Sequence, residues 1–140
     1  MIEKYFLTKK IKKETKEILS KYGTLREKDK DLIFRFNNKD YYLNFLYVKN
    51  DKELFINNQT IWEVYGSNSL IINQRLKEAK TFITIVYPTL TPVKVWINEN
   101  TVEFVKLRKI YNYYVILFAD LERLVETLKW LKLKMLILNI

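Results

Sequence analysis

The sequence contains neither cysteine nor histidine. Without cysteine, the chain can form no disulfide, zinc–thiolate site or iron–sulfur cluster, and it has no thiol nucleophile. Without histidine, it lacks the side chain that most often serves as a general base and as a metal ligand. Catalysis by a Ser/His/Asp or Cys/His arrangement is therefore excluded within this chain, and we expect neither a metal nor a cofactor.

Glycine and proline are also scarce. Each occurs twice in 140 residues, where average usage gives roughly ten and seven. A phosphate-cradling loop needs clustered glycines, and Gly23 and Gly66 stand far apart. No apolar run of about 18 residues lacks a charge, so the sequence predicts no membrane-spanning segment. The N-terminus shows no signal-peptide cleavage site, and we expect a cytoplasmic protein.

What the chain has in excess is positive charge: 25 Lys and Arg against 16 Asp and Glu give a net charge of +9. Apolar residues make up 49% of the chain, which is typical of a folded domain rather than of a disordered chain. Abundant Lys, Ile, Tyr and Asn also match an A+T-rich genome, which explains part of the charge. A functional positive surface would indicate nucleic acid rather than a membrane as the partner.

The N-terminal half predicts a helix followed by an antiparallel meander. Residues 2–22 place apolar residues on one helical face, and Gly23 stands where a helix would end in a left-handed residue. Three strands are then expected, at residues 32–36, 41–48 and 54–56. Polar turn residues such as Asn37–Asp40 separate them. We expect these elements to form a lobe over residues 1–70.

The C-terminal half, residues 71–140, predicts a mixed α/β domain. Residues 61–65 and 70–79 suit helices on either side of the lobe boundary. Strands are expected at residues 81–87, 93–97, 101–107 and 113–118, with a hairpin turn at 98–100. The expected fold class is therefore α+β, with a helix-plus-meander lobe followed by this second domain.

The last 30 residues give the clearest pattern. Asp120 can cap a helix that carries one continuous apolar face. The residues of that face are Leu121, Leu124, Val125, Leu128 and Leu131. Residues 135–140 are almost all apolar and predict a final strand that must be buried on both faces. The chain is thus expected to end in a strand, a helix and a strand.

This ending resembles the C-terminal domain of archaeal tRNA-splicing endonucleases. In that family the helix carries a run of the type L-x-x-x-V-R-x-A-x-S-V-R-K, and an apolar strand follows. The corresponding run here is residues 121–134. Upstream, the segment from Phe82 to Tyr87, followed by Pro88, is similar to the strand that supplies the catalytic tyrosine of the family. The resemblance covers about residues 80–140 and implies an endonuclease-like C-terminal domain.

The resemblance implies a role in cutting the bulge–helix–bulge motif of precursor tRNA, which the family does without a metal. Its tyrosine, histidine and lysine positions fall here at Tyr87, Val102 and Leu133. Losing a positioned acid costs roughly 10²–10⁴-fold in rate, so we expect no cleavage by this chain alone. Because family members assemble as dimers of heterodimers, the resemblance implies a non-catalytic structural subunit that orders a catalytic subunit and helps to recognise precursor tRNA.

The candidate binding residues lie near both ends of the chain. The expected RNA-binding residues are Lys9, Lys10, Lys12, Lys13, Lys132 and Lys134. For the N-terminal lysines, the alternative is a solvated helix face. The expected subunit interface consists of Met135, Leu136, Ile137, Leu138 and Ile140. In the family, the terminal strands of two subunits pair edge to edge.

Two other functions compete for the same residues. A degenerate restriction-type nuclease would place Asp31 and the segment Tyr47–Lys49 in one metal site, although Tyr47 stands where a carboxylate is needed. A stand-alone basic binding module would instead stack exposed bases on tyrosines beside lysine and arginine. The tyrosines in question are Tyr41, Tyr42, Tyr47, Tyr111, Tyr113 and Tyr114. Cross-strand packing is the alternative for those tyrosines.

Overall fold

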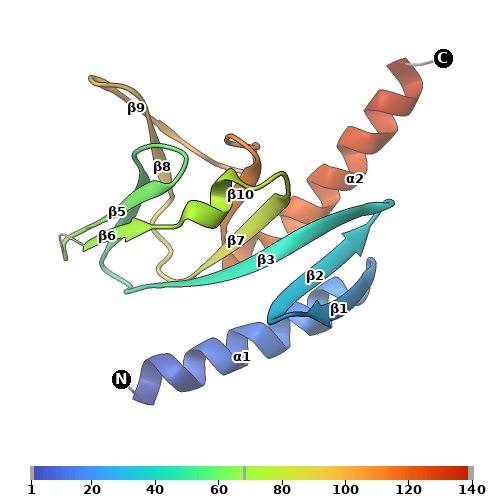
Figure 1. The fold of residues 1–140 in the computed structure, drawn as a ribbon, viewed down its shortest axis with the longest axis horizontal. Helices are drawn as coiled ribbons and strands as arrows, with labels where there is room; N and C mark the ends of the chain where they lie inside the picture. The colour runs from blue at the N-terminus through green and yellow to red at the C-terminus, as the bar shows by residue number, and fades with distance from the viewer. Residues whose placement is uncertain (1, 68, 139–140) are drawn as a thin grey trace.

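The computed structural model describes residues 2–67 and 69–138 and confirms the α+β class. The described strands form two five-stranded sheets, and a long helix stands near each end of the chain (Figure 1). We call these sheets A and B.

Sheet A is a mixed sheet. In spatial order it contains β1 (Thr24–Lys28), β2 (Asp31–Phe36), β3 (Lys39–Val48), β7 (Thr81–Pro88) and β10 (Tyr113–Leu117). β1, β2 and β3 pair antiparallel, whereas β3, β7 and β10 run parallel. The β2–β3 turn uses Asn37 and Asn38, whose positive φ angles of 53° and 62° suit a two-residue hairpin. The strands predicted at 32–36, 41–48, 81–87 and 113–118 are thereby confirmed, and β1 is an additional strand.

Sheet B contains β6 (Ser69–Ile72), β5 (Ile61–Tyr65), β4 (Glu53–Ile56), β8 (Lys94–Asn98) and β9 (Thr101–Phe104) in that order. β4 and β8 are parallel neighbours, and the other pairs are antiparallel. The strand predicted at 54–56 is confirmed as β4, but it pairs in sheet B rather than in the meander. The β8–β9 hairpin confirms the strands predicted on either side of residues 98–100.

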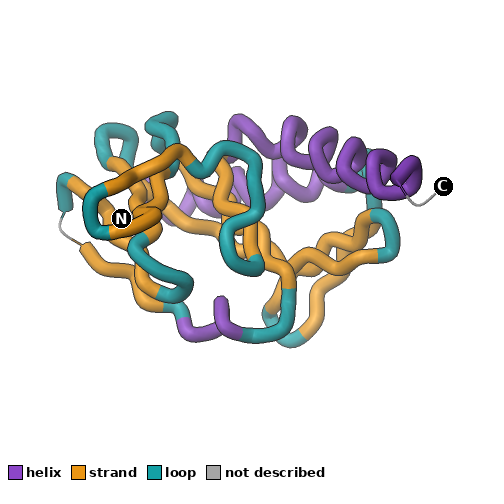
Figure 2. Tube along the Cα trace, turned by 90° about the horizontal axis from the view of Figure 1, so that it is seen from above, coloured by secondary structure: helices purple, strands orange, loops and turns teal. Residues whose placement is uncertain are grey.

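Sheet A is the middle of three layers. One face packs against α1 (Ile2–Leu19) and α2 (Leu121–Leu138), and the opposite face packs against sheet B. Both long helices therefore lie on the same side of the strands (Figure 2). In the interior strand β7, Ile83 and Ile85 join the core beneath the helices, while Phe82 and Val86 join the core beneath sheet B. Burial on both faces is what a parallel strand between two layers requires.

The two halves of the chain are interleaved. Sheet A combines β1, β2 and β3 with β7 and β10, and sheet B combines β4 and β5 with β8 and β9. The lobe boundary predicted at residue 70 falls inside β6. Within the described residues, no helix is long and apolar enough to span a bilayer.

The end of the described chain is a helix, and the predicted final strand is wrong. α2 begins directly after Asp120 and continues through Met135 to Leu138. No glycine or proline interrupts it, and leucine, lysine and methionine all favour helix. A strand from Met135 would need a break after Lys134 that the sequence does not supply. Ile140, the last predicted interface residue, lies outside the described residues.

The segments 61–65 and 70–79, predicted as helices, form strands and a short turn instead. Residues 61–65 are β5, and residues 70–79 span most of β6 and the 3₁₀ turn η1 (Gln74–Lys77). In β5, buried Trp62 and Val64 alternate with less buried neighbours, a period of two that marks a strand. The segment is too short to separate this period from a helical one by sequence alone.

Gly23 follows α1 as predicted, but it does not adopt the expected left-handed conformation; of the two glycines, Gly66 has the positive φ, 96°. The N–H of Gly23 donates to the carbonyl oxygen of Leu19 at 3.1 Å. A Cβ atom on residue 23 would collide with the carbonyl oxygen of Arg35 and would lie 2.9 Å from Phe34 Cε1. Glycine is needed here because the chain passes close to β2.

Candidate nucleic-acid interface

The charges of α1 are divided between two sides of the helix. Lysines occupy positions 9, 12, 13 and 16, the i, i+3, i+4, i+7 spacing of neighbours on one helical face. The neighbouring side holds Glu3, Lys10, Glu14 and Glu17, while Lys4 stands apart from both sets, over the ring of Tyr47. All four lysines of the first set are exposed. We call Lys9, Lys12, Lys13 and Lys16 the lysine stripe; Lys10, expected to belong with them, lies on the mixed side.

A cleft of about 380 Å³ lies beside the lysine stripe. Its charged lining consists of Lys12, Lys16, Lys30, Arg75, Glu27 and Asp31. Neutral residues complete it, among them Asn44 and Phe45 of β3. We call this cavity the basic cleft. It gathers residues from α1, the β1–β2 hairpin, β3 and η1, so distant parts of the chain build one surface.

Ion pairs neutralise only part of the basic cleft. Lys16 Nζ lies 3.1 Å from a carboxylate oxygen of Glu27, and Arg75 pairs with Asp31 at 2.9 Å. Within the part of the chain that the structure describes, Lys12 and Lys30 have no carboxylate partner. Lys12 Nζ instead stands 5.5 Å from the centroid of the Phe45 ring. The cleft therefore keeps a net positive charge that an anion can neutralise.

Hydrogen bonding fixes the charge state of the Arg75–Asp31 pair. The bonds from Arg75 hold the pKa of Asp31 below its ordinary value, and the same bonds raise the pKa of Arg75. Both groups are therefore charged at neutral pH, and neither is set up as a general acid or base.

The three positions matched to catalytic residues are not brought together. Tyr87 is buried in β7, its hydroxyl 2.9 Å from Thr8 Oγ1 in a hydrogen bond, and burial raises its pKa. Val102 lies in β9, paired with Trp96. Leu133 lies on the exposed end of α2. Figure 1 places β9 and the end of α2 on opposite sides of the molecule.

The end of α2 is also remote from the lysine stripe. Lys132 and Lys134 are exposed there, and neither lines the basic cleft. The predicted interface residues Met135, Leu136, Ile137 and Leu138 are between 56% and 75% exposed. They stand on a helix that projects beyond the sheets (Figure 1). Their proposed role as a subunit contact remains a prediction, although the strand form expected for it is wrong.

The tyrosines expected as stacking platforms are mostly structural. Tyr41, Tyr113 and Tyr114 are buried in the two cores. Burial raises the pKa of Tyr41 to about 12 and also raises the pKa of the other two. Tyr42 and Tyr47 are half-buried, and Tyr111 is exposed. These strand tyrosines therefore serve mainly to pack the sheets.

The restriction-type arrangement is not formed. Asp31 begins β2, and the register that pairs Leu32 with Leu43 places it opposite residue 44. Lys49 follows β3 five positions farther along, about 16 Å away at roughly 3.3 Å per strand residue. Asp31 is also engaged by Arg75. The described residues contain no group of three or more carboxylates suited to a metal ion.

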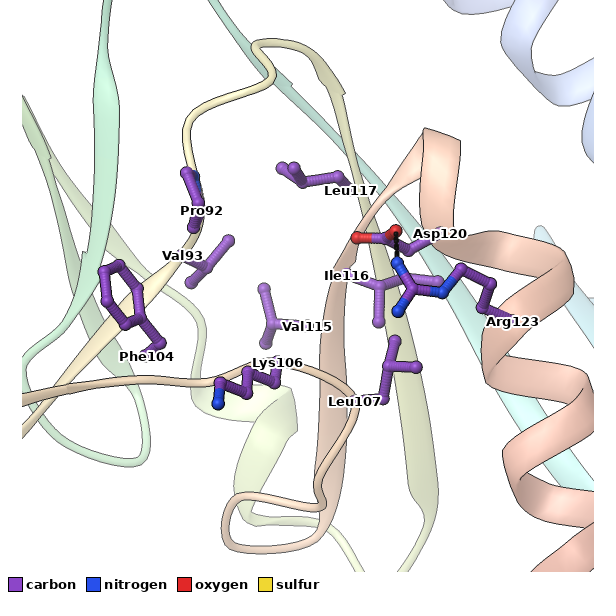
Figure 3. Close-up of a pocket in the computed structure, with 10 residues that line it drawn as sticks. All are labelled: Pro92, Val93, Phe104, Lys106, Leu107, Val115, Ile116, Leu117, Asp120 and Arg123. Carbon is purple, nitrogen blue, oxygen red and sulfur yellow. Dashed lines mark hydrogen bonds and ion pairs between the residues drawn. The ribbon is translucent and has the colours of Figure 1, made fainter.

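A larger cavity, of about 640 Å³, lies elsewhere, between the β10–α2 junction and the loop after β9 (Figure 3). Most of its lining is apolar, including Val93, Phe104 and Val115. Its charged lining is Lys106 and the pair of Asp120 with Arg123, joined at 3.2 Å. This cavity offers no convergent set of catalytic groups, and the basic cleft is therefore the stronger candidate site.

Sequence reasoning singled out some residues of this candidate site and missed others. It singled out Lys9, Lys12 and Lys13, but not Lys30, Arg75 or Phe45 of the basic cleft. The missing residues come from a hairpin turn, a 3₁₀ turn and a strand, and no local pattern joins them.

No protein-family model, curated protein or solved structure was found to match the chain.

Proposed function

We propose that this chain is a non-catalytic nucleic-acid-binding protein that holds a phosphate backbone along the lysine stripe and in the basic cleft. The observation that carries this proposal is the division of charge on α1. Dispersed positive charge from compositional bias would surround the helix, whereas four lysines share one side, and two of them, Lys12 and Lys16, line a cationic cavity.

The dimensions of the lysine stripe suit a polyanion. From Lys9 to Lys16 the helix rises about 10 Å at 1.5 Å per residue. One nucleic-acid strand carries a charge roughly every 3.4 Å along its axis, so about three phosphates fit this length. A helix flanked by a cavity with two unneutralised lysines can therefore follow a backbone rather than bind one isolated anion.

The role in tRNA splicing that the resemblance implied stays a prediction. That resemblance depended on a strand after the last helix, and residues 135–138 are helical. RNA remains the favoured nucleic acid, and the cytoplasm the favoured location, as proposals. The non-catalytic role rests on the missing histidine and on the wide separation of Tyr87, Val102 and Leu133.

The decisive experiment measures binding of a labelled single-stranded RNA across 50–200 mM salt. The stripe variant replaces Lys9, Lys12, Lys13 and Lys16 with Gln. The matched control replaces four lysines outside the stripe: Lys10, Lys21, Lys132 and Lys134. Each lost single-strand phosphate contact lowers the log–log salt slope by about 0.7. We expect the magnitude of this slope to fall by about 2–3 in the stripe variant and to stay close to the wild-type value in the control.

Equal losses in the two variants would show that the charge acts as a dispersed field, and the stripe would not be the site. An unchanged slope in the stripe variant would show that these lysines form only a solvated face. Cleavage of the RNA by the purified chain, with or without Mg²⁺, would contradict the non-catalytic part of the proposal.

A further inference from the structure

A second cavity, of about 180 Å³, adjoins the basic cleft. It shares Asn44 and Phe45 with that cleft and continues past them between sheets A and B. It opens beside the part of β3 that β2 no longer pairs with, because the β2–β3 pairing ends at Leu43. We call this cavity the polar pocket.

A buried hydroxyl in the polar pocket has no partner. Thr84 is 3% exposed and lines the pocket, and its Oγ1 atom makes no hydrogen bond with any residue that the structure describes. Nearly all buried polar atoms in native proteins are hydrogen-bonded, and an orphaned one calls for an explanation such as a bound group. Thr84 is directly paired with Asn44 across β3 and β7, so two polar side chains occur side by side.

The opposite wall of the polar pocket is held rigid. Trp62 lines it, and its Nε1 atom donates to the hydroxyl of Tyr113 at 3.2 Å. That hydroxyl in turn donates to the carbonyl oxygen of Gln59 at 3.0 Å. The N–H of Asn73 donates to the carbonyl oxygen of Thr60 at 2.9 Å, which ties the end of sheet B in place. The pocket is therefore formed before any ligand arrives.

The two adjoining cavities differ in charge. The polar pocket contains no charged side chain in its lining, only amide, hydroxyl, aromatic and aliphatic groups. The basic cleft beside it contains four cations. A ligand that fits both must have a flat neutral part with hydrogen-bonding edges and an anionic part attached to it. A nucleotide has this division between base and phosphate.

We infer that the polar pocket binds one nucleobase while its phosphate lies in the basic cleft. This inference rests on the proposed function and adds base recognition to backbone binding. The pocket volume of about 180 Å³ lies below the range of about 300–1,000 Å³ for drug-sized ligands. It therefore suits one base at a time. The nucleotide belongs either to a single strand or to a free mononucleotide pool.

The test uses Thr84→Val, which keeps the shape of the side chain and removes its hydroxyl. Thr15→Val is the matched control, because Thr15 Oγ1 is also buried and unpartnered but lies in α1 and lines neither cavity. Binding is measured with homopolymeric RNA strands of each base, with an abasic strand of equal length, and with the four nucleoside monophosphates. Thermal melts confirm that both variants are folded.

We expect the wild type to prefer one homopolymer over the abasic strand by at least tenfold. Thr84→Val should reduce that preference by about tenfold, which corresponds to the loss of one hydrogen bond. The affinity for the abasic strand should not change. Thr15→Val should change neither. If strands bind with a steep salt dependence but no base preference, the polar pocket is not a base site and the backbone proposal survives.

If a mononucleotide binds with the same sensitivity to Thr84→Val and no strand binds, the pocket inference holds for a free nucleotide and the proposed function fails. If neither strands nor mononucleotides bind, both fail. A preference that Thr84→Val leaves intact would assign base recognition to another surface and overturn the inference.

Discussion

Arg75 and Asp31 form a two-pronged ion pair between η1 and the start of β2. Arg75 Nη1 donates to Asp31 Oδ1 at 2.9 Å, and Nη2 donates to Oδ2 at 3.0 Å. The two residues are 44 positions apart in the chain, and both line the basic cleft. The pair thus fixes the segment between the sheets against the meander, and it sets one wall of the site.

The stability contributed by Asp31 should disappear in acid. Hydrogen bonds from Arg75 lower its folded-state pKa, so its contribution is complete above the unfolded value of about 3.9 and is lost as the pH falls through the lower folded value. We expect Asp31→Asn to be less stable than the wild type by about 0.5–1 kcal/mol at pH 7, the range for a partly exposed pair. Urea unfolding at a series of pH values should show the two proteins converging near pH 2. A difference that persists there would show that the aspartate acts through packing.

Gly23→Ala should destabilise the protein. Ordinarily, a Gly-to-Ala change in a relaxed backbone stabilises by about 0.4–1 kcal/mol. Here the new Cβ atom would collide with the backbone carbonyl of Arg35, and such overpacking costs about 1–3 kcal/mol. Gly66→Asn is the comparison: at a φ of 96°, with its Cβ 2.6 Å from Lys52 Cδ, it should also destabilise, but through local backbone strain and a flexible side chain rather than through a clash with the backbone of a neighbouring strand. Denaturant midpoints measure both changes, and a stabilised Gly23→Ala variant would contradict the close approach.

The strands that sequence could predict are those with a local signal. The two asparagines at 37 and 38 mark one hairpin, and the β-branched and aromatic residues of β7 mark a buried strand. The end of α2 and the segment from β5 to η1 lack such a signal, because short apolar runs fit either period. The residues of the candidate site were harder to predict than the strands. Lysine spacing on α1 is visible in the sequence, but the placement of Arg75 and Phe45 around the same cleft depends on which strands pair, and pairing is not encoded locally.

Tyr87 and Thr8 should behave as a structural pair. Their hydroxyls are 2.9 Å apart and join β7 to α1. We expect Tyr87→Phe and Thr8→Val each to cost about 1 kcal/mol, and the double variant to cost less than the sum, because either change removes the same bond. Tyr111→Phe, at a residue that is 54% exposed, is the control and should have no effect. Additive costs in the double-mutant cycle would show that the two hydroxyls do not interact.

Substitutions in the two halves of α2 should differ strongly in their effect on the free energy of unfolding. Leu124 is fully buried against sheet A, whereas Leu138 is 75% exposed. Removing a buried leucine side chain costs about 2–5 kcal/mol, and a surface change away from special features costs within about 0.5 kcal/mol. We expect Leu124→Ala to lower the unfolding free energy strongly, and Leu138→Asp to leave it unchanged.

Leu138→Asp also tests the expected role of this end as a subunit contact, because it adds charge without touching the core. Apolar side chains at 135, 136, 137 and 138 are all more than half exposed, and contiguous exposed apolar surface of this kind marks contacts in many proteins. If the end is a contact, sedimentation should show the wild type as an assembly and the folded Leu138→Asp variant as a monomer. The same species for both would exclude a contact between copies of this chain through the end of α2. An unfolded Leu138→Asp variant would mean that the end of α2 packs within the core, contrary to its exposure in the structure.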